Sequence, residues 1–324
     1  QLIERLGVKF QFNVNVGEAI TLNEVAHQYD AVFLAIGTWK EAWVYLPGTE
    51  LSGVIPALPF LEAVARDEQA PAGKRVVVIG GGNAAIDSAR TALRMGAEVT
   101  IVYRRERKDM PAIPEEILSA EHEGATIVYR AAPHRIVGNK NGQVRAIEAV
   151  RTKPGEFDTS GRRRPVLTDE VIRFECDTVI LAVGETVDPD FLRASGLKLH
   201  DTGSGTIEVD RYSLETSRER FYAGGDLITG ASNVSNAMGY GKDAARSIDE
   251  RLMGRQRFAS IFPEFAYAME PPEVPGEDGR HVPAELPAAQ RVLSYAEVSL
   301  GLTPVAAVRE AARCLRCDVR SAEH

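Results

Sequence analysis

Apolar residues along this chain occur in short runs separated by amphipathic stretches, a pattern that predicts strands alternating with helices. Residues 73–190 are the most regular part, which opens on the run Val76–Ile79 and ends in the strand-like segment 176–184. Unbroken runs of this kind, together with Ala31–Ile36, are typical of parallel strands that are covered on both faces. The pattern therefore favours an α/β fold.

Weaker patterns flank this region. Alternation and β-branched residues predict a strand over Val8–Val16, and a helix is expected from about Leu22. A further helix is predicted near Phe60–Arg66. Toward the C-terminus, a strand is expected to lead into residues 221–226, and a helix to run from about Asn233 to Leu252.

The composition changes beyond residue 254. Residues 271–287 are rich in proline, which fixes φ and removes backbone donors, so an extended linker is expected. Thr303 followed by Pro304 predicts the start of a last helix, because threonine is a good N-cap and proline suits the first helical position.

Composition and charge exclude several classes of protein. The chain has 324 residues, and its 38 basic and 46 acidic side chains give a net charge of −8. This balance argues against nucleic acid as a partner, and no apolar run is long enough for a membrane span. Three cysteines cannot form a disulfide framework in a chain of this size, so a reducing compartment and a cytoplasmic location are expected.

The strongest motif is a glycine-rich turn between a buried strand and a helix. Gly80, Gly82 and Ala85 fit the pattern G-x-G-x-x-A, with Asn83 at the start of the helix. Gly80 permits a tight turn, Gly82 lets the backbone approach a pyrophosphate, and Ala85 keeps helix and strand close. The helix N-terminus offers unpaired N–H groups to phosphates, so the motif predicts a nicotinamide-nucleotide site.

The end of the next strand bears on the choice between NAD and NADP. An acidic residue there would accept a bond from the ribose 2′-hydroxyl, whereas this chain has Arg104 and Arg105. Guanidinium groups suit a phosphate, so NADP(H) is favoured over NAD(H). The other interpretation of these arginines is a solvated basic loop.

Three other small-residue turns follow strand-like segments. They contain Gly37 and Thr38, Gly184, and Gly225 with Asp226. Glycine lets the backbone pass close to a ligand, but each turn alone is more often a plain connection between strand and helix.

Taken in order between about residues 30 and 250, these segments resemble the NADPH-dependent glutamate synthase small (β) subunit-like family of FAD/NAD(P)-binding oxidoreductases. The matching segments are YDAVFLAIGT, GKRVVVIGGGNAAIDSAR with VYRR and MPA, CDTVILAVG, and FYAGGDLITGASNVSNAMGYGKDAA. The resemblance implies a Rossmann-like NAD(P)-binding domain inserted in an FAD-binding domain.

The resemblance also implies roles for individual residues. Gly184 joins the NAD(P) site, and Gly37 and Thr38 line the cofactor crevice. Gly225 and Asp226 would lie at the ribityl and pyrophosphate groups of FAD, with Asp226 accepting a hydroxyl bond. The helix that begins near Asn233 and Val234 would face the flavin pyrimidine, where its N-terminus stabilises negative charge on reduced flavin.

The domain organisation expected from the resemblance has four parts. Residues 1–70 are the later part of the first FAD segment, 71–190 the NAD(P) domain, 191–254 the second FAD segment, and 255–324 the linker with a C-terminal helix. The family has an earlier G-x-G-x-x-G turn for the FAD ADP moiety, which this sequence lacks. We therefore expect the chain to begin inside a partial FAD domain.

The C-terminal segment contains a C-x-x-C pair, Cys314 and Cys317. Similar segments in the related reductases accompany iron–sulfur clusters, but two thiolates are half the ligands of a [4Fe–4S] cluster. A redox dithiol and an inert helix end are the alternatives. Cys176 is expected to be packing, and the absence of cysteine from residues 106–135 argues against direct disulfide reduction.

The resulting hypothesis is an FAD-dependent NAD(P)H oxidoreductase. It would be an electron-input subunit that passes hydride to FAD and then electrons to an iron–sulfur or catalytic partner subunit in a hetero-oligomer. No side chain is singled out as catalytic, since the chemistry belongs to the cofactors. The alternatives are a glutamate synthase small subunit proper and a non-catalytic nucleotide-binding assembly module.

Overall fold

The computed structural model describes residues 2–42, 45–66, 72–158, 161–200, 205–254 and 280–312. The chain folds into two compact units, one made of residues 1–40 and 185–264 and the other of residues 41–184 and 265–324. The chain thus crosses from one unit to the other three times along its length. The short strands β2 (Lys40–Glu41) and β11 (Glu185–Thr186) pair with each other.

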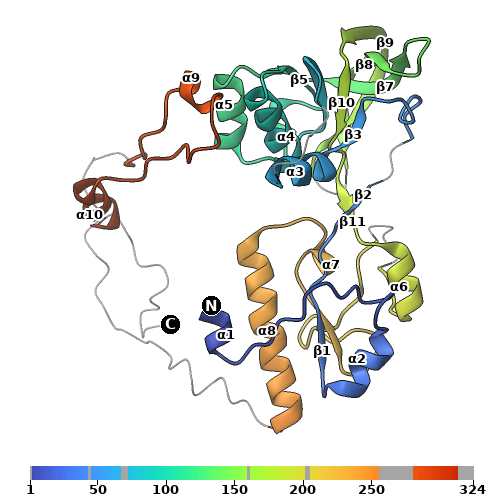
Figure 1. The fold of residues 1–324 in the computed structure, drawn as a ribbon, viewed down its shortest axis with the longest axis vertical. Helices are drawn as coiled ribbons and strands as arrows, with labels where there is room; N and C mark the ends of the chain where they lie inside the picture. The colour runs from blue at the N-terminus through green and yellow to red at the C-terminus, as the bar shows by residue number, and fades with distance from the viewer. Residues whose placement is uncertain are drawn as a thin grey trace. The chain divides into compact units, whose positions relative to one another are not determined.

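A five-stranded parallel sheet forms the centre of the second unit (Figure 1). Its strands, in spatial order, are β3 (Val54–Pro56), β10 (Thr178–Leu181), β4 (Arg75–Ile79), β5 (Glu98–Val102) and β6 (Thr126–Val128). Every neighbouring pair is parallel. The predicted α/β fold with a parallel sheet is therefore confirmed.

The sheet is covered on both faces, which explains its unbroken apolar runs. Val76 and Val78 of β4 pack in one core with residues of α3 (Ala57–Ala65), α4 (Asn83–Arg94) and α5 (Pro114–His122). Val77 and Ile79, which point to the opposite face, pack in a second core with Ile147 of an antiparallel sheet.

That antiparallel sheet consists of β7 (Ala131–Gly138), β8 (Val144–Phe157) and β9 (Arg163–Glu175). Strands β8 and β9 form a long hairpin, which Figure 1 shows at the edge of this unit. Its turn is closed by the Asp158 N–H, which donates to the Arg162 carbonyl across 2.8 Å. The arginine-rich segment 162–164 therefore lies at the tip of this hairpin.

The first unit is built around two parallel strands, β1 (Val32–Leu34) and β12 (Phe221–Ala223). Its helices are α1 (Leu2–Arg5), α2 (Leu22–Gln28), α6 (Pro189–Ser195), α7 (Asp226–Thr229) and α8 (Val234–Met253). A core that includes Ile207 and Leu227 joins the strands to the helices. The helices expected from about Leu22 and Asn233 are α2 and α8.

The prediction of a strand over Val8–Val16 is wrong. The only pairing described there is an isolated bridge between Val16 and Ile20. Phe10 and Phe12 are exposed and stack on each other, with ring centroids 5.7 Å apart. A strand needs a hydrogen-bonded neighbour, and no described segment pairs with residues 8–15.

The predicted domain boundaries and the compact units differ at residues 41–70. Val54–Pro56 pair with β10, and α3 packs in the core of the parallel sheet, so residues 41–66 belong structurally with the nucleotide-binding sheet. The division expected at residue 70 thus falls inside the second unit, because it came from motif order and not from packing.

The C-terminal part contains α9 (Ala288–Arg291) and α10 (Pro304–Ala312). The Thr303 hydroxyl accepts a bond from the Ala306 N–H across 3.2 Å, which confirms the expected start of the last helix. Residues 271–279 of the expected linker lie outside the described residues. Within the described residues, no helix is long and apolar enough to cross a membrane.

Candidate functional site

The glycine-rich turn joins β4 to α4. Gly80 has φ of +148°, and a Cβ there would lie 2.1 Å from the Ala182 carbonyl oxygen. A Cβ on Gly81 would lie 2.4 Å from the ring of Tyr103. Both positions require glycine because the neighbouring strand ends pack against the turn.

Gly82 differs from these two glycines. The nearest atom to a Cβ at Gly82 would be a carbon of Pro111 at 4.0 Å, so the packing of the chain does not require glycine there. Gly82 is the N-cap of α4, and no side chain caps this end of the helix. The turn therefore leaves free space and unpaired N–H groups at a helix N-terminus, which suits a phosphate group. Ala85, on the inner face of α4, is fully buried.

Asn83 uses its side chain within the protein. Its Oδ1 accepts a bond from the Ile113 N–H across 3.0 Å, and the Gly81 carbonyl accepts one from the Ala112 N–H across 3.1 Å. The segment after the short 3-10 helix η1 (Arg107–Asp109) is thereby tied to the glycine-rich turn. The Asn83 Oδ1 is thus used within the protein, and the donors that Asn83 can offer a nucleotide are its backbone N–H and its side-chain NH2 group.

Arg104 and Arg105 lie just beyond β5 and line one small pocket. The remaining residues around this pocket are Glu106, Asp109, Arg130, Thr152, Lys153, Pro154, Arg163, Arg164 and Pro165. The Arg105 side chain is 9% exposed, and its Nη2 lies 2.8 Å from the Asp158 carboxylate. Arg104 is exposed, and it forms no ion pair with any carboxylate among the described residues.

The environment of Arg104 is electropositive. Desolvation lowers the pKa of Arg104, and the nearby charges of Arg105 and Arg162 lower it further. Like charges held together in this way are stabilised by an anion. The pocket beyond β5 is thus suited to a phosphate group.

Gly184 comes three residues after the end of β10. The Ala182 N–H donates to the Ile79 carbonyl across 2.8 Å, so the ends of β10 and β4 are bonded to each other. Gly184 itself has φ of +119°, a conformation that favours glycine. It therefore follows the strand that adjoins the glycine-rich turn.

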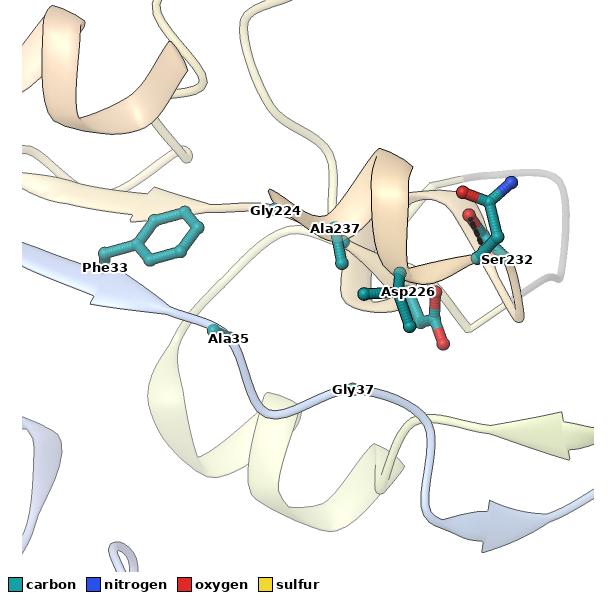
Figure 2. A pocket seen from close by; sticks show the side chains of 10 residues that line it. Phe33, Ala35, Gly37, Gly224, Asp226, Ser232 and Ala237 are labelled. Atoms are coloured by element: carbon teal, nitrogen blue, oxygen red, sulfur yellow. Dashed lines mark hydrogen bonds between the residues drawn. The ribbon is translucent and has the colours of Figure 1, made fainter. Parts of the chain in front are cut away.

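A second pocket, of about 250 Å³, lies in the first unit (Figure 2). It is lined by Phe33, Ala35, Gly37, Gly224, Gly225, Asp226, Ser232, Asn233, Val234 and Ala237. Figure 2 shows Gly37, on the turn after β1, across the pocket from Asp226 and Ala237. The fold thus brings together five of the six residues that the sequence assigned to a flavin site.

The sixth residue, Thr38, is 8% exposed and is not among the lining residues. Gly37 and Gly225 have φ of +66° and +65°, so both turns need glycine. Asn233 Oδ1 accepts a bond from the Asn236 N–H across 2.9 Å and caps α8, while Val234 is 76% exposed. The helix N-terminus at this pocket is therefore pre-formed.

The sequence did not single out Phe33, Ala35, Gly224, Ser232 or Ala237 as lining residues. A Cβ on Gly224 would lie 2.8 Å from the Tyr240 Cβ, so this glycine serves the packing of α8 on β12.

Asp226 is the one carboxylate among the residues that line the pocket. Desolvation raises the pKa of Glu185, and the negative charge of Asp226 raises it further.

Cysteine chemistry is limited in the described part of the chain. Cys176 is fully buried, and burial raises its pKa to about 12, so it is a packing residue as expected. Cys314 and Cys317 lie outside the described residues. Among those that are described, no group of three or more His, Cys, Asp or Glu side chains could hold a metal ion.

A parallel sheet with a glycine-rich turn before a helix defines a Rossmann-type nucleotide-binding protein. More specifically, the chain belongs to the pyridine nucleotide-disulphide oxidoreductase family, whose model matches residues 2–241. The family resemblance seen in the sequence is thereby confirmed.

Two curated relatives illustrate the match. The chain is 39% identical to the NADP(+)-dependent formate dehydrogenase subunit beta of Moorella thermoacetica, over 98% of this chain and 46% of the relative. It is 35% identical to the glutamate synthase [NADPH] small chain of Halomonas elongata, over 78% of this chain and 56% of the relative. The chain thus spans about half the length of the curated relatives it matches.

Among solved structures, the chain is similar to FprA of Mycobacterium tuberculosis in complex with NADPH. The TM-score is 0.62 at 22% identity, and the match covers 76% of this chain and 69% of FprA. This likeness supports the fold.

Proposed function

We propose that the chain is part of an FAD-dependent NAD(P)H oxidoreductase that serves as an electron-input subunit. In this proposal hydride passes from NADP(H) to FAD, and electrons then pass to an iron–sulfur or catalytic partner subunit. The observation that carries the proposal is that one chain has two pre-formed strand-to-helix sites, one at Gly82 and one between Gly37 and Gly225.

The proposed NAD(P) site uses backbone more than side chains. Gly80 and Gly81 shape the turn, and the space at Gly82 lets the pyrophosphate approach the uncapped N-terminus of α4. Gly184 would border the same site from the adjacent strand. Arg104 would meet the adenosine 2′-phosphate, which is why NADP(H) is favoured over NAD(H).

The proposed flavin site fits the residues of the second pocket. Gly37 and Gly225 have no side chains and adopt the positive φ that both turns require, and the Asp226 carboxylate would accept a hydroxyl bond from the ribityl chain. The N-terminus of α8 would stabilise negative charge on the flavin. When bound, FAD accepts the hydride and releases electrons singly, chemistry that no side chain of the protein has to supply.

The partner is inferred from the relatives. The relatives described above are named as a subunit beta and a small chain, which supports a place for this chain in a hetero-oligomer. A [4Fe–4S] cluster that uses Cys314 and Cys317 together with other ligands belongs to the proposal, as does the cytoplasmic location.

A glutamate synthase small subunit proper is the second candidate. The match to the formate dehydrogenase subunit includes 98% of this chain, whereas the glutamate synthase small chain matches 78%. The wider match favours a general electron-input subunit. A nucleotide-binding assembly module without turnover is the third candidate.

Steady-state assays with the polypeptide that contains this chain separate these candidates. NADPH-dependent reduction of ferricyanide, a one-electron acceptor, is expected, without reduction of disulfides. Turnover of glutamine and 2-oxoglutarate by co-purified subunits would favour the glutamate synthase. An absence of any NADPH oxidation would contradict the proposed function.

A further inference from the structure

The pocket beyond β5 is far more basic than the rest of the chain. Six cations line it, and only two acidic residues, Glu106 and Asp109, lie among them. The six are Arg104, Arg105, Arg130, Lys153, Arg163 and Arg164. In a chain with a net charge of −8, such a concentration of positive charge needs an explanation beyond a solvated surface.

Two of these cations, Arg105 and Arg163, form contacts with other groups of the protein. Arg105 is paired with Asp158, and its Nε donates to the Arg163 carbonyl across 2.9 Å. The Arg163 guanidinium lies 4.6 Å from the centre of the Phe157 ring and donates to the Gly155 carbonyl. These two arginines therefore hold the hairpin tip against the end of β5.

The other four cations have no such partner in the described part of the chain. Arg104 and Arg130 come from the ends of β5 and β6, while Lys153 and Arg164 come from the two strands of the hairpin. The described residues include no carboxylate within ion-pair distance of any of them.

Hydrogen bonds to backbone carbonyls fix the hairpin to these strand ends. The Thr152 hydroxyl donates to the Arg104 carbonyl across 2.8 Å, and the Thr152 N–H donates to the Arg130 carbonyl across 2.9 Å. The Arg130 N–H in turn donates to the Arg105 carbonyl across 3.0 Å. Lys153, the next residue after Thr152, lines the same pocket as Arg104.

We infer that Lys153 and Arg164 of the β8–β9 hairpin complete, with Arg104, the site for the 2′-phosphate of NADP(H). This inference rests on the proposed function. A phosphate monoester carries close to two negative charges at neutral pH, so a single free arginine does not neutralise it. The hairpin, which is outside the nucleotide-binding motif itself, is thus a specificity-determining element.

The test measures binding of two small probes to the full chain by calorimetry. Adenosine 2′,5′-bisphosphate has the 2′-phosphate, and 5′-AMP lacks it. Lys153→Gln and Arg164→Gln should each weaken binding of the bisphosphate by about fivefold, and the double variant should weaken it by more. The affinity for 5′-AMP should not change in any of these variants. Lys140→Gln, an exposed lysine in the turn before β8, is the matched control and should change neither.

The outcomes separate this inference from the proposed function. If the wild-type chain prefers the bisphosphate and the double variant keeps that preference, the hairpin has no part in selectivity and the inference is overturned. An equal loss of affinity for both probes would also overturn it, because the hairpin would then only support the fold. If the wild-type chain does not distinguish the probes, the NADP(H) preference in the proposed function fails as well.

Discussion

The guanidinium of Arg105 is held by Asp158, with Nη2 of the arginine 2.8 Å from Oδ2 of the carboxylate. Its neighbour Arg104 is exposed and has no ion-pair partner among the residues that the structure describes. Two adjacent arginines that look equivalent in the sequence therefore have different environments. Of these two arginines, Arg104 is the one that can bind an incoming anion without breaking a described ion pair.

Separate substitution of these arginines should give different results. Arg104→Ala is expected to raise KM for NADPH by about tenfold and leave KM for NADH nearly unchanged, because a charge-assisted phosphate contact is lost. Arg105→Ala should affect the two nucleotides alike and lower the free energy of unfolding, since it leaves Asp158 without this partner. Steady-state kinetics with both nucleotides is the measurement. An equal effect of Arg104→Ala on NADPH and NADH would contradict the assignment.

Substitutions of two glycines in the turn should distinguish an effect on stability from an effect on nucleotide binding. Gly82→Ala adds a methyl group with no protein atom closer than 4.0 Å, so it should cost at most about 1 kcal/mol of stability while weakening nucleotide binding strongly. Gly80→Ala would bring a Cβ to 2.1 Å from the Ala182 carbonyl oxygen and should cost more than about 3 kcal/mol. Urea unfolding and NADPH titration of both variants check this. Unimpaired nucleotide binding by Gly82→Ala would count against a pyrophosphate at that turn.

Glu123 anchors a buried ionic network. Its side chain is 0% exposed and is paired with Arg90 and Arg94 at 2.6 and 2.9 Å. Burial raises the pKa of Glu123, but the bonds and charges of the two arginines outweigh burial and lower it below the ordinary 4.5. Its stabilising contribution is therefore present above pH 4.5 and is lost as the pH falls through the lowered pKa.

Glu123→Gln should accordingly destabilise the protein by about 3 kcal/mol near neutral pH, because it removes the charge that Arg90 and Arg94 share, although Arg90 still pairs with Glu116. The difference from wild type should shrink in acid. Urea unfolding at several pH values measures it, and Glu98→Gln, at an exposed residue of β5, is the control. A difference that stays constant with pH would show that the charge of Glu123 is not what stabilises the network.

The contribution of Glu185 to stability should depend on pH in the opposite direction from that of Glu123. Desolvation and the nearby Asp226 raise the pKa of Glu185 above 4.5, so its contribution to stability is complete below pH 4.5 and is lost as the pH rises through the raised value. Glu185→Gln should therefore increase the free energy of unfolding near neutral pH, and this gain should vanish in acid. Thermal unfolding across the pH range tests the sign, and a loss of stability at neutral pH would refute it.

The regular part of the fold could be predicted from the sequence because its signals are local. The run Val76–Ile79, the glycine pattern after it and the cap at Asn233 each determine an element through neighbouring residues. The supposed strand Val8–Val16 could not be judged in this way. Strand formation depends on a pairing partner elsewhere, and alternation alone does not provide one.

The sequence also could not predict which groups the side chains of the candidate site bond to. The bond from Ile113 to Asn83 joins residues far apart in the chain, and so does the pair between Arg105 and Asp158. The hairpin cations Lys153 and Arg164 reach the end of β5 only because the antiparallel sheet packs on the parallel one. Contacts of this kind depend on tertiary packing, for which the sequence has no local signal.

An anaerobic titration with NADPH tests whether the proposed nicotinamide and flavin sites act together. The sample is the polypeptide that contains this chain, purified with its co-purifying subunits, and the measurement is the visible absorption of the flavin. We expect that the flavin band bleaches in step with added NADPH, and that NADH has the same effect only at much higher concentration. Binding of NADPH without bleaching of a flavin band would contradict it and leave a nucleotide-binding module.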